Sequence, residues 1–269
     1  TIDNDLPVTD HCPGYGSASK YIASSLKEVI RDNESFGAKK PTICIVEIMG
    51  RNAGWLTAAA ALAKGEDCSG ADAIYLPEKV FDMDAFMEKV KHLAETKSSV
   101  VIAVSEGIKI EDGRYVCELA NENVAVDAFG HKQMSGTAAF LAQKIAEETG
   151  LKTRAIELST LQRAATHLAS LTDVNEAFQV GYDAVLAAEE GKTGMMITLD
   201  RSDNDPYLCG TSAYDIHAIA NVERPVPDEW ITEDGCGLND GYIEYARPLI
   251  MGELIPMFVD GLPYHLVRK

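Results

Sequence analysis

The sequence predicts an α/β fold in which a parallel sheet carries helices on both faces. Apolar runs rich in β-branched residues at 42–48, 71–76 and 99–104 have the length and composition of buried strands. Segments of about a dozen residues with helical spacing separate them, and such crossovers let successive strands run parallel. Two more strands are expected at 153–158 and 194–199, the last of which closes the regular part of the chain.

Five helices are expected around these strands because apolar residues recur at helical spacing. They cover residues 17–33, 55–63, 82–96, 137–148 and 173–190. Asp173 is the expected N-cap of the last helix, since aspartate accepts hydrogen bonds from the free N–H groups of a first turn. The polar stretch 106–132 is predicted to be an insertion over a site. From Arg201 onward, prolines and scattered acidic residues replace clear periodicity, so we expect a less regular tail that wraps over an existing surface.

The overall composition argues against several classes of protein. The formal net charge of -18 would repel nucleic acid and anionic membranes, so local cations have to hold any phosphate-bearing ligand. No stretch approaches the roughly 18 apolar residues of a membrane span and the N-terminus lacks signal-peptide features, so a cytoplasmic location is expected. The six cysteines form no CxxC pair and the histidines have no HExxH spacing, so neither a zinc site nor a disulfide framework is signalled.

The first residues of the chain place two carboxylates close together. Asp3 and Asp5 are two apart in a short polar loop, so an extended backbone would direct both side chains to one face. Transfer of a phosphoryl group to an alcohol requires a carboxylate that accepts the hydroxyl proton and, usually, an acidic ligand for Mg²⁺. The pattern suits both tasks, but it is equally typical of a turn or a helix cap.

A second set of residues is expected near the carboxyl ends of the strands, where open parallel sheets bind ligands. The run 49–51, Met-Gly-Arg, follows the first strand and Glu106 follows the third. Arg154 lies on the fourth strand, and Arg163 comes shortly after it. Each arginine alone could belong to a solvated turn or a surface salt bridge. Three of them, in a chain with 24 Lys and Arg against 42 Asp and Glu, favour a sugar phosphate because the guanidinium fork can donate two hydrogen bonds to phosphate.

The order and spacing of these pieces resemble the phosphofructokinase family. Thr1-Ile2-Asp3-Asn4-Asp5 is similar to the family's catalytic TIDND loop, and the run 46–55 is similar to its Met-Gly-Arg substrate turn. Leu161-Gln162-Arg163 is similar to part of its HxQR signature. The resemblance covers nearly the whole chain and implies a Rossmann-type, three-layer fold.

For activity, the resemblance implies transfer of a phosphoryl group to the 1-hydroxyl of fructose 6-phosphate. Asp3 would remove the hydroxyl proton, and Asp5 would hold Mg²⁺ or orient the donor. Thr1 and Arg51 would stabilise charge on the group in transfer. Glu106 would accept a hydrogen bond from a sugar hydroxyl. The substrate-binding residues that the resemblance implies are Ile2, Met49, Gly50, Glu106, Arg154, Thr160 and Arg163, of which the two arginines would anchor the 6-phosphate.

The identity of the phosphoryl donor is suggested by departures from the bacterial ATP-dependent enzymes. Thr160 stands in place of a histidine, Ala164-Ala165 in place of paired glycines, and Thr42 in place of an arginine that reaches across a subunit interface. These departures resemble the pyrophosphate-dependent branch, as do the segments 129–133, 161–163, 167–181 and 245–252. We therefore expect pyrophosphate as donor in a reversible reaction, with ATP as the alternative.

The resemblance also divides the chain into parts. Residues 1–16 would be a remnant of the donor-side domain, 17–165 the fructose 6-phosphate domain, and 166–269 a C-terminal helix, strand and wrapping tail. Because the chain opens at Thr1 inside the catalytic loop, without a methionine, we expect the donor-binding part to lie upstream and the isolated chain to lack it. The family suggests a homodimer or homotetramer with active sites near subunit boundaries.

Two alternatives stay open at this point. His131, beside Lys132, could contact a phosphate or could simply stabilise its loop. The chain as a whole could be a non-catalytic module that senses sugar phosphates, because an α/β fold by itself implies no reaction. Such a sensor would have no need of a base at Asp3.

Overall fold

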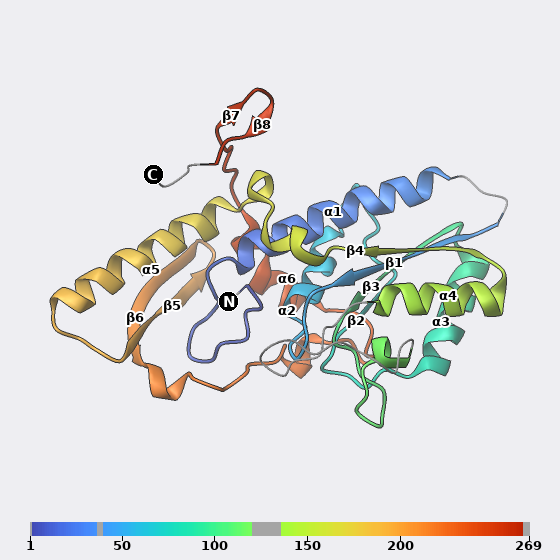
Figure 1. The fold of residues 1–269 in the computed structure, drawn as a ribbon, viewed down its shortest axis with the longest axis horizontal. Helices are drawn as coiled ribbons and strands as arrows, with labels where there is room; N and C mark the ends of the chain where they lie inside the picture. The colour runs from blue at the N-terminus through green and yellow to red at the C-terminus, as the bar shows by residue number, and fades with distance from the viewer. Residues whose placement is uncertain (1, 37–39, 120–135, 266–269) are drawn as a thin grey trace.

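The computed structural model describes residues 2–36, 40–119 and 136–265, and its larger sheet has four strands (Figure 1). The strands are β1 (Thr42–Ile48), β2 (Ala73–Tyr75), β3 (Ser99–Ser105) and β4 (Lys152–Glu157). Their spatial order is β2-β3-β1-β4, and every pairing is parallel. The predicted α/β fold is therefore confirmed, and the carboxyl ends of β1, β3 and β4 meet at one edge.

Helices cover both faces of this sheet, as predicted. They are α1 (Tyr15–Ser35), α2 (Trp55–Ala58), α3 (Met83–Thr96) and α4 (Thr137–Thr149). The first two pack on one face and the last two on the other. Successive residues of a strand point to opposite faces, so Cys44 and Val46 enter the core under α1, whereas Ile43 and Ile45 enter the core under α3 and α4. The central strand β1 is buried on both sides.

The helix α5 (Leu171–Glu189) begins differently from the prediction. Its N-cap is Ser170, whose hydroxyl accepts a hydrogen bond from the Asp173 N–H, so the expected cap at Asp173 is wrong. The Asp173 carboxylate instead accepts hydrogen bonds from the Gly14 N–H at 2.6 Å and the Ser17 N–H at 3.1 Å. It thereby satisfies free donors at the start of α1, which has no side-chain cap of its own, and ties α5 to that helix.

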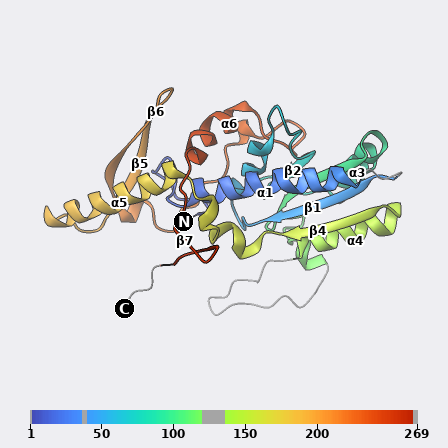
Figure 2. The same ribbon diagram turned by 90° about the horizontal axis from the view of Figure 1, so that it is seen from above.

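The expectation that regular structure ends at residue 199 is also wrong. Strand β5 (Met195–Asn204) continues beyond it and pairs in antiparallel register with β6 (Tyr207–Asp215). Pro206 lies in the turn between the two strands, where it removes no ladder hydrogen bond, so it does not interrupt the hairpin. Figures 1 and 2 both place α5 and this hairpin at one end of the molecule and the four-stranded sheet at the other.

Part of the C-terminal region, α6 (Asp240–Ala246), returns to the core beneath α1. The strands β7 (Phe258–Val259) and β8 (Leu262–Pro263) that follow are largely exposed and project from the body of the molecule (Figure 1). Tyr242, Tyr245 and Leu249 are buried in the same cluster as α1 and α2. Among the described residues, no helix has both the length and the apolar character that a membrane crossing needs.

Candidate active site

Two tight turns, which follow β1 and β3, form the floor of the site. A Cβ atom on Gly107 would lie 2.0 Å from the Arg51 carbonyl oxygen, so only glycine lets the two turns touch. The Ser105 hydroxyl links them: it donates to the Gly50 carbonyl oxygen and accepts from the Gly107 N–H at 3.2 Å. Gly50 itself has φ 148°, a region that favours glycine. The backbone of residues 49–51 is therefore held in one conformation.

Glu106 joins the same two turns through its side chain. Its N–H donates to the Ile48 carbonyl oxygen at 3.0 Å, and its carboxylate accepts from the Gly50 N–H at 3.4 Å. Burial raises the pKa of Glu106, and the opposing effects of this N–H group and of the Arg51 charge offset the rise only in part. The carboxylate is thus fixed at the carboxyl end of the sheet, where a ligand hydroxyl could donate to it.

A short 3-10 helix (Ser159–Arg163) follows β4 and docks onto the first turn. Gln162, only 2% exposed, makes the contact: its side-chain oxygen accepts from the Met49 N–H at 3.4 Å and its amide nitrogen donates to the Ser159 carbonyl oxygen at 2.9 Å. The sequence associates this glutamine with a phosphate-binding signature, but the structure gives it a positioning contact. Docking of this helix brings Arg163 toward the opening loop.

Asp3 lies where the loop meets these turns. Burial is the main cause that raises the pKa of Asp3, and the neighbouring charge of Asp5 raises it further. The positive charges of Arg163 and Arg51 act in the opposite direction, so both arginines lie within electrostatic range of the carboxylate. The predicted loop, the 49–51 turn and the helix after β4 are therefore brought together, as the sequence motifs imply.

The loop keeps its shape through residues that the sequence did not single out. Asn4 is fully buried with φ 59°, a left-handed conformation that asparagine tolerates better than most residues. Its amide donates to the Tyr245 hydroxyl at 2.9 Å and its oxygen accepts from the Cys12 N–H at 2.8 Å. Arg224 donates to the carbonyl oxygens of Asn4 and Thr9 and lies over the Trp55 ring at 4.8 Å. No local sequence pattern could have revealed the contacts of this loop with Tyr245 and Arg224, which span more than 200 residues.

A buried acid, Glu47, lies beneath this edge of the sheet and was also not predicted as part of the site. It is 4% exposed, and its carboxylate accepts from the Ala138 N–H at 2.8 Å, at the first turn of α4. Burial raises the pKa of Glu47 to about 7, and the nearby charges of Glu157 and Glu106 contribute in the same direction.

Not every predicted residue joins the group. Arg154 pairs with Cys44 in the sheet register, five residues before Met49, so it lies about 16 Å from that turn at the usual rise per strand residue. Its guanidinium contacts Asp32 at 3.2 Å and stacks on the Phe36 ring at 4.0 Å. The grouping of Arg154 with the strand-end arginines is therefore wrong for a single chain.

Ile2 and Thr160 also belong to the predicted set. Ile2 packs against the core under α1, and its side chain would meet a Cβ on Gly14 at 2.9 Å. Thr160 is exposed on the 3-10 helix beside the site. Thr1, His131 and Lys132 lie outside the described residues.

Comparison with known proteins agrees with this arrangement. Residues 1–188 match the sequence profile described as phosphofructokinase. The chain belongs to the phosphofructokinase family. It is 41% identical over 263 residues to the pyrophosphate--fructose 6-phosphate 1-phosphotransferase of Methylococcus capsulatus, an alignment that covers 98% of this chain and 62% of that protein.

Solved structures extend the similarity to the fold. The pyrophosphate-dependent phosphofructokinase of Nitrosospira multiformis superposes with a TM-score of 0.86 at 38% identity, over 99% of this chain and 62% of that one. The enzyme of the same name from Marinobacter aquaeolei gives a TM-score of 0.85 at 35% identity, over 100% and 64%. The chain thus spans just over six tenths of the length of these relatives.

Proposed function

We propose that this chain carries the acceptor site and the base of a phosphotransferase that moves a phosphoryl group from pyrophosphate to the 1-hydroxyl of fructose 6-phosphate. The observation that carries the proposal is Asp3, a half-buried carboxylate that lies within the electrostatic reach of Arg51 and Arg163. One anionic group beside two guanidinium groups suits an alcohol that also bears a phosphate. The products would be fructose 1,6-bisphosphate and phosphate.

In this proposal Asp3 accepts the proton of the 1-hydroxyl as its oxygen attacks phosphorus. Its raised pKa makes it a better proton acceptor than an ordinary aspartate. Arg51 stabilises charge on the group in transfer, and Arg163 holds the 6-phosphate. Glu106 and the fixed backbone of Met49 and Gly50 orient the sugar, so that the hydroxyl and the base meet in one geometry.

Mg²⁺ is the expected cofactor, and the acidic pair fits a divalent cation. The charge of Asp5 raises the pKa of Asp3, so the two carboxylates repel each other within a partly buried loop. A cation held by Asp5 would offset that repulsion and, when bound, would neutralise the charge of the donor. Asp3 would then remain available for the hydroxyl proton.

Arg154 supports a proposal about assembly. Because it lies about 16 Å from the turn at Met49 in its own chain, its guanidinium could hold a 6-phosphate only in the site of a neighbouring copy. This favours a homodimer or homotetramer with sites near subunit boundaries. The fructose 6-phosphate and pyrophosphate that we propose as substrates are charged and do not cross membranes freely, which supports a cytoplasmic location.

The base is tested by the substitution Asp3→Asn, which keeps the shape but removes the proton acceptor, in the N-terminally extended protein described in the next paragraph. We expect kcat to fall by a factor of about 10² to 10⁴ while fructose 6-phosphate affinity is retained. Asp84→Asn, an exposed aspartate on α3 with the same chemical change, is the matched control and should leave kcat unaltered. Full turnover in Asp3→Asn would contradict the proposal.

The donor is tested by assays with pyrophosphate and with ATP. Both should be run on this chain and on the chain extended at its N-terminus with the preceding part of the Methylococcus capsulatus relative. We expect turnover in the extended protein with pyrophosphate. Turnover with ATP alone would overturn the donor assignment, and fructose 6-phosphate binding without turnover with either donor would favour a sensor.

A further inference from the structure

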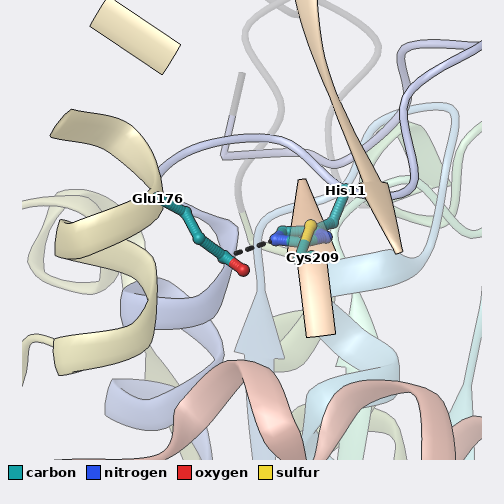
Figure 3. A group of neighbouring side chains, drawn as sticks. All are labelled: His11, Glu176 and Cys209. Atoms are coloured by element: carbon teal, nitrogen blue, oxygen red, sulfur yellow. Dashed lines mark hydrogen bonds and ion pairs between the residues drawn. The ribbon is translucent and has the colours of Figure 1, made fainter. Parts of the chain in front are cut away.

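A second group of chemically reactive side chains lies beside the segment that follows the Asp3 loop. His11 follows that loop, Glu176 lies on α5 and Cys209 lies on β6, so three separate segments bring them together (Figure 3). One donor atom from each residue lies within 4.8 Å of the other two. None of the three belongs to the acceptor site described above.

The His11 ring is held in a defined orientation. Its Nδ1 atom lies 2.7 Å from an Asp10 oxygen, and its Nε2 atom lies 2.7 Å from an oxygen of Glu176. Arg201 fixes Asp10 in turn through two contacts at 2.8 and 3.1 Å. Histidines that bind metal ions usually donate one ring N–H to a carboxylate and turn the other nitrogen to the ion. The ring of His11, 1% exposed, has this supporting carboxylate.

Strand β6 supplies the rest of the group. Tyr207 and Cys209 are two residues apart, so both side chains point to the same face of the hairpin. The Tyr207 hydroxyl donates to one oxygen of Glu176, and the other oxygen is the one that meets His11. A hydrogen-bonded histidine–glutamate pair would need neither the thiol nor the tyrosine in these positions. Together the residues provide nitrogen, oxygen and sulfur donors that converge on one point.

We propose that His11, Glu176 and Cys209 bind a zinc-type divalent transition-metal ion. Zinc accepts this mixture of ligands, whereas Mg²⁺ prefers oxygen alone, so the site is chemically distinct from the acidic pair of the catalytic loop. A neutral imidazole, a carboxylate and a thiolate balance the two positive charges of the ion. Three protein ligands leave a fourth, tetrahedral position for water.

Metal binding exchanges protons for the ion without any oxidation or reduction. The ion replaces the hydrogen that lies between Nε2 of His11 and Glu176, and it takes the place of the thiol proton of Cys209. Nδ1 of His11 keeps its hydrogen and donates it to the Asp10 carboxylate. Binding should therefore release protons and tighten as the pH rises.

The location gives the site a structural consequence. His11 is adjacent to Cys12, whose N–H donates to the side chain of Asn4 in the middle of the catalytic loop. An ion at His11 would tie this loop to α5 and to the hairpin at once. The site would hold the loop in place rather than contact a reacting group.

The test uses Co²⁺ as a spectroscopic probe and Zn²⁺ retained after dialysis. We expect one equivalent of either ion per chain and, with Co²⁺, the intense near-ultraviolet absorption of a thiolate–cobalt bond. Cys209→Ser should abolish that absorption, and His11→Gln should weaken binding at least as much as the ~10- to 100-fold typical of lost supporting residues. Tyr207→Phe should weaken it by about 10-fold or more. Cys68→Ser removes a half-buried thiol outside the group and is the matched control.

Thermal unfolding separates loss of the ion from loss of the fold. Zn²⁺ should raise the Tm of the unaltered protein and of Cys68→Ser, because it binds the folded state, and should leave that of Cys209→Ser unchanged. Absence of binding to the unaltered protein would overturn the proposal. The proposal would also be overturned if the Co²⁺ spectrum of Cys209→Ser equalled that of the unaltered protein. In that case His11 and Glu176 are simply a hydrogen-bonded pair.

Discussion

The two ends of the sheet use arginine for different purposes. At the carboxyl ends of the strands, Arg51 and Arg163 lie near Asp3 and oppose the rise in its pKa. Near the amino end of β4, Arg154 pairs with Asp32 and stacks on Phe36 instead. All three arginines carry the same planar fork, so the side chain alone does not decide the role. Register along the strand decides which end of the sheet, and therefore which neighbours, each guanidinium meets.

The largest effect at the carboxyl end should come from Gly107→Ala. The new Cβ would overlap the Arg51 carbonyl oxygen, a backbone atom that can move only if the two turns separate. We expect a loss of about 3 kcal/mol in the free energy of unfolding and a loss of fructose 6-phosphate binding, measured by urea denaturation and calorimetry. Gly181→Ala on α5, where a Cβ meets nothing within 4 Å, should be neutral or stabilising. If Gly107→Ala left both the free energy of unfolding and fructose 6-phosphate binding unchanged, the two turns would not require this contact.

The comparison is sharpened by removing one arginine at each end. Arg163→Met should weaken fructose 6-phosphate affinity by about 10- to 100-fold, the usual cost of losing a charged hydrogen-bond partner. Arg154→Met should have no such effect at protein concentrations where the chain is monomeric, and an effect only in an assembled form. Titration calorimetry at matched assembly states, checked by light scattering, measures both. Equal losses in the dilute monomer would contradict the separation that the sheet register gives.

A third effect, which depends on pH, concerns the acid that lies beneath the carboxyl end. Because burial raises the pKa of Glu47 from 4.5 to about 7, the folded state keeps a proton that the unfolded state has lost between these values. Its stabilising contribution is full below about pH 4.5 and is lost as the pH rises through about 7, by at most roughly 3 kcal/mol. Glu47→Gln should remove this dependence when stability is measured by denaturation from pH 4 to 8. Parallel curves for the two proteins would show that folding does not change the pKa of Glu47.

The sheet was predictable because its signals are local. The apolar runs of β1 and β3 and the helical periodicity between them identify buried strands and crossovers without any knowledge of tertiary contacts. The hairpin of β5 and β6 was missed because acidic residues and Pro206 lie in the turn and the strand end before it, which look like irregular structure in the sequence. Asp173 was misread since its carboxylate caps a helix more than 150 residues away.

The sequence predicts the motif residues of the candidate site but not the residues that hold them in position. The motifs identify Asp3, the 49–51 turn, Glu106 and Arg163, all of which the fold brings to one edge of the sheet or to the loop beside it. They say nothing of Gln162 as the residue that positions Met49, because that contact requires the 3-10 helix to dock. A supporting contact such as that of Gln162 forms only in the folded backbone, so the sequence does not reveal it. A reacting group must be of a particular residue type, so the sequence can reveal it.

The hydrogen bond between Asn4 and Tyr245 limits how early during synthesis the loop around Asn4 can take its folded shape. The two residues are 241 positions apart, so the loop that contains Asn4 cannot complete this contact until the ribosome has added Tyr245. Contacts of such long separation form late, since the intervening chain must first be ordered. A nascent chain that stops before Tyr245 would contain Asp3 and Asp5 but would lack the hydrogen bond that holds Asn4 between them.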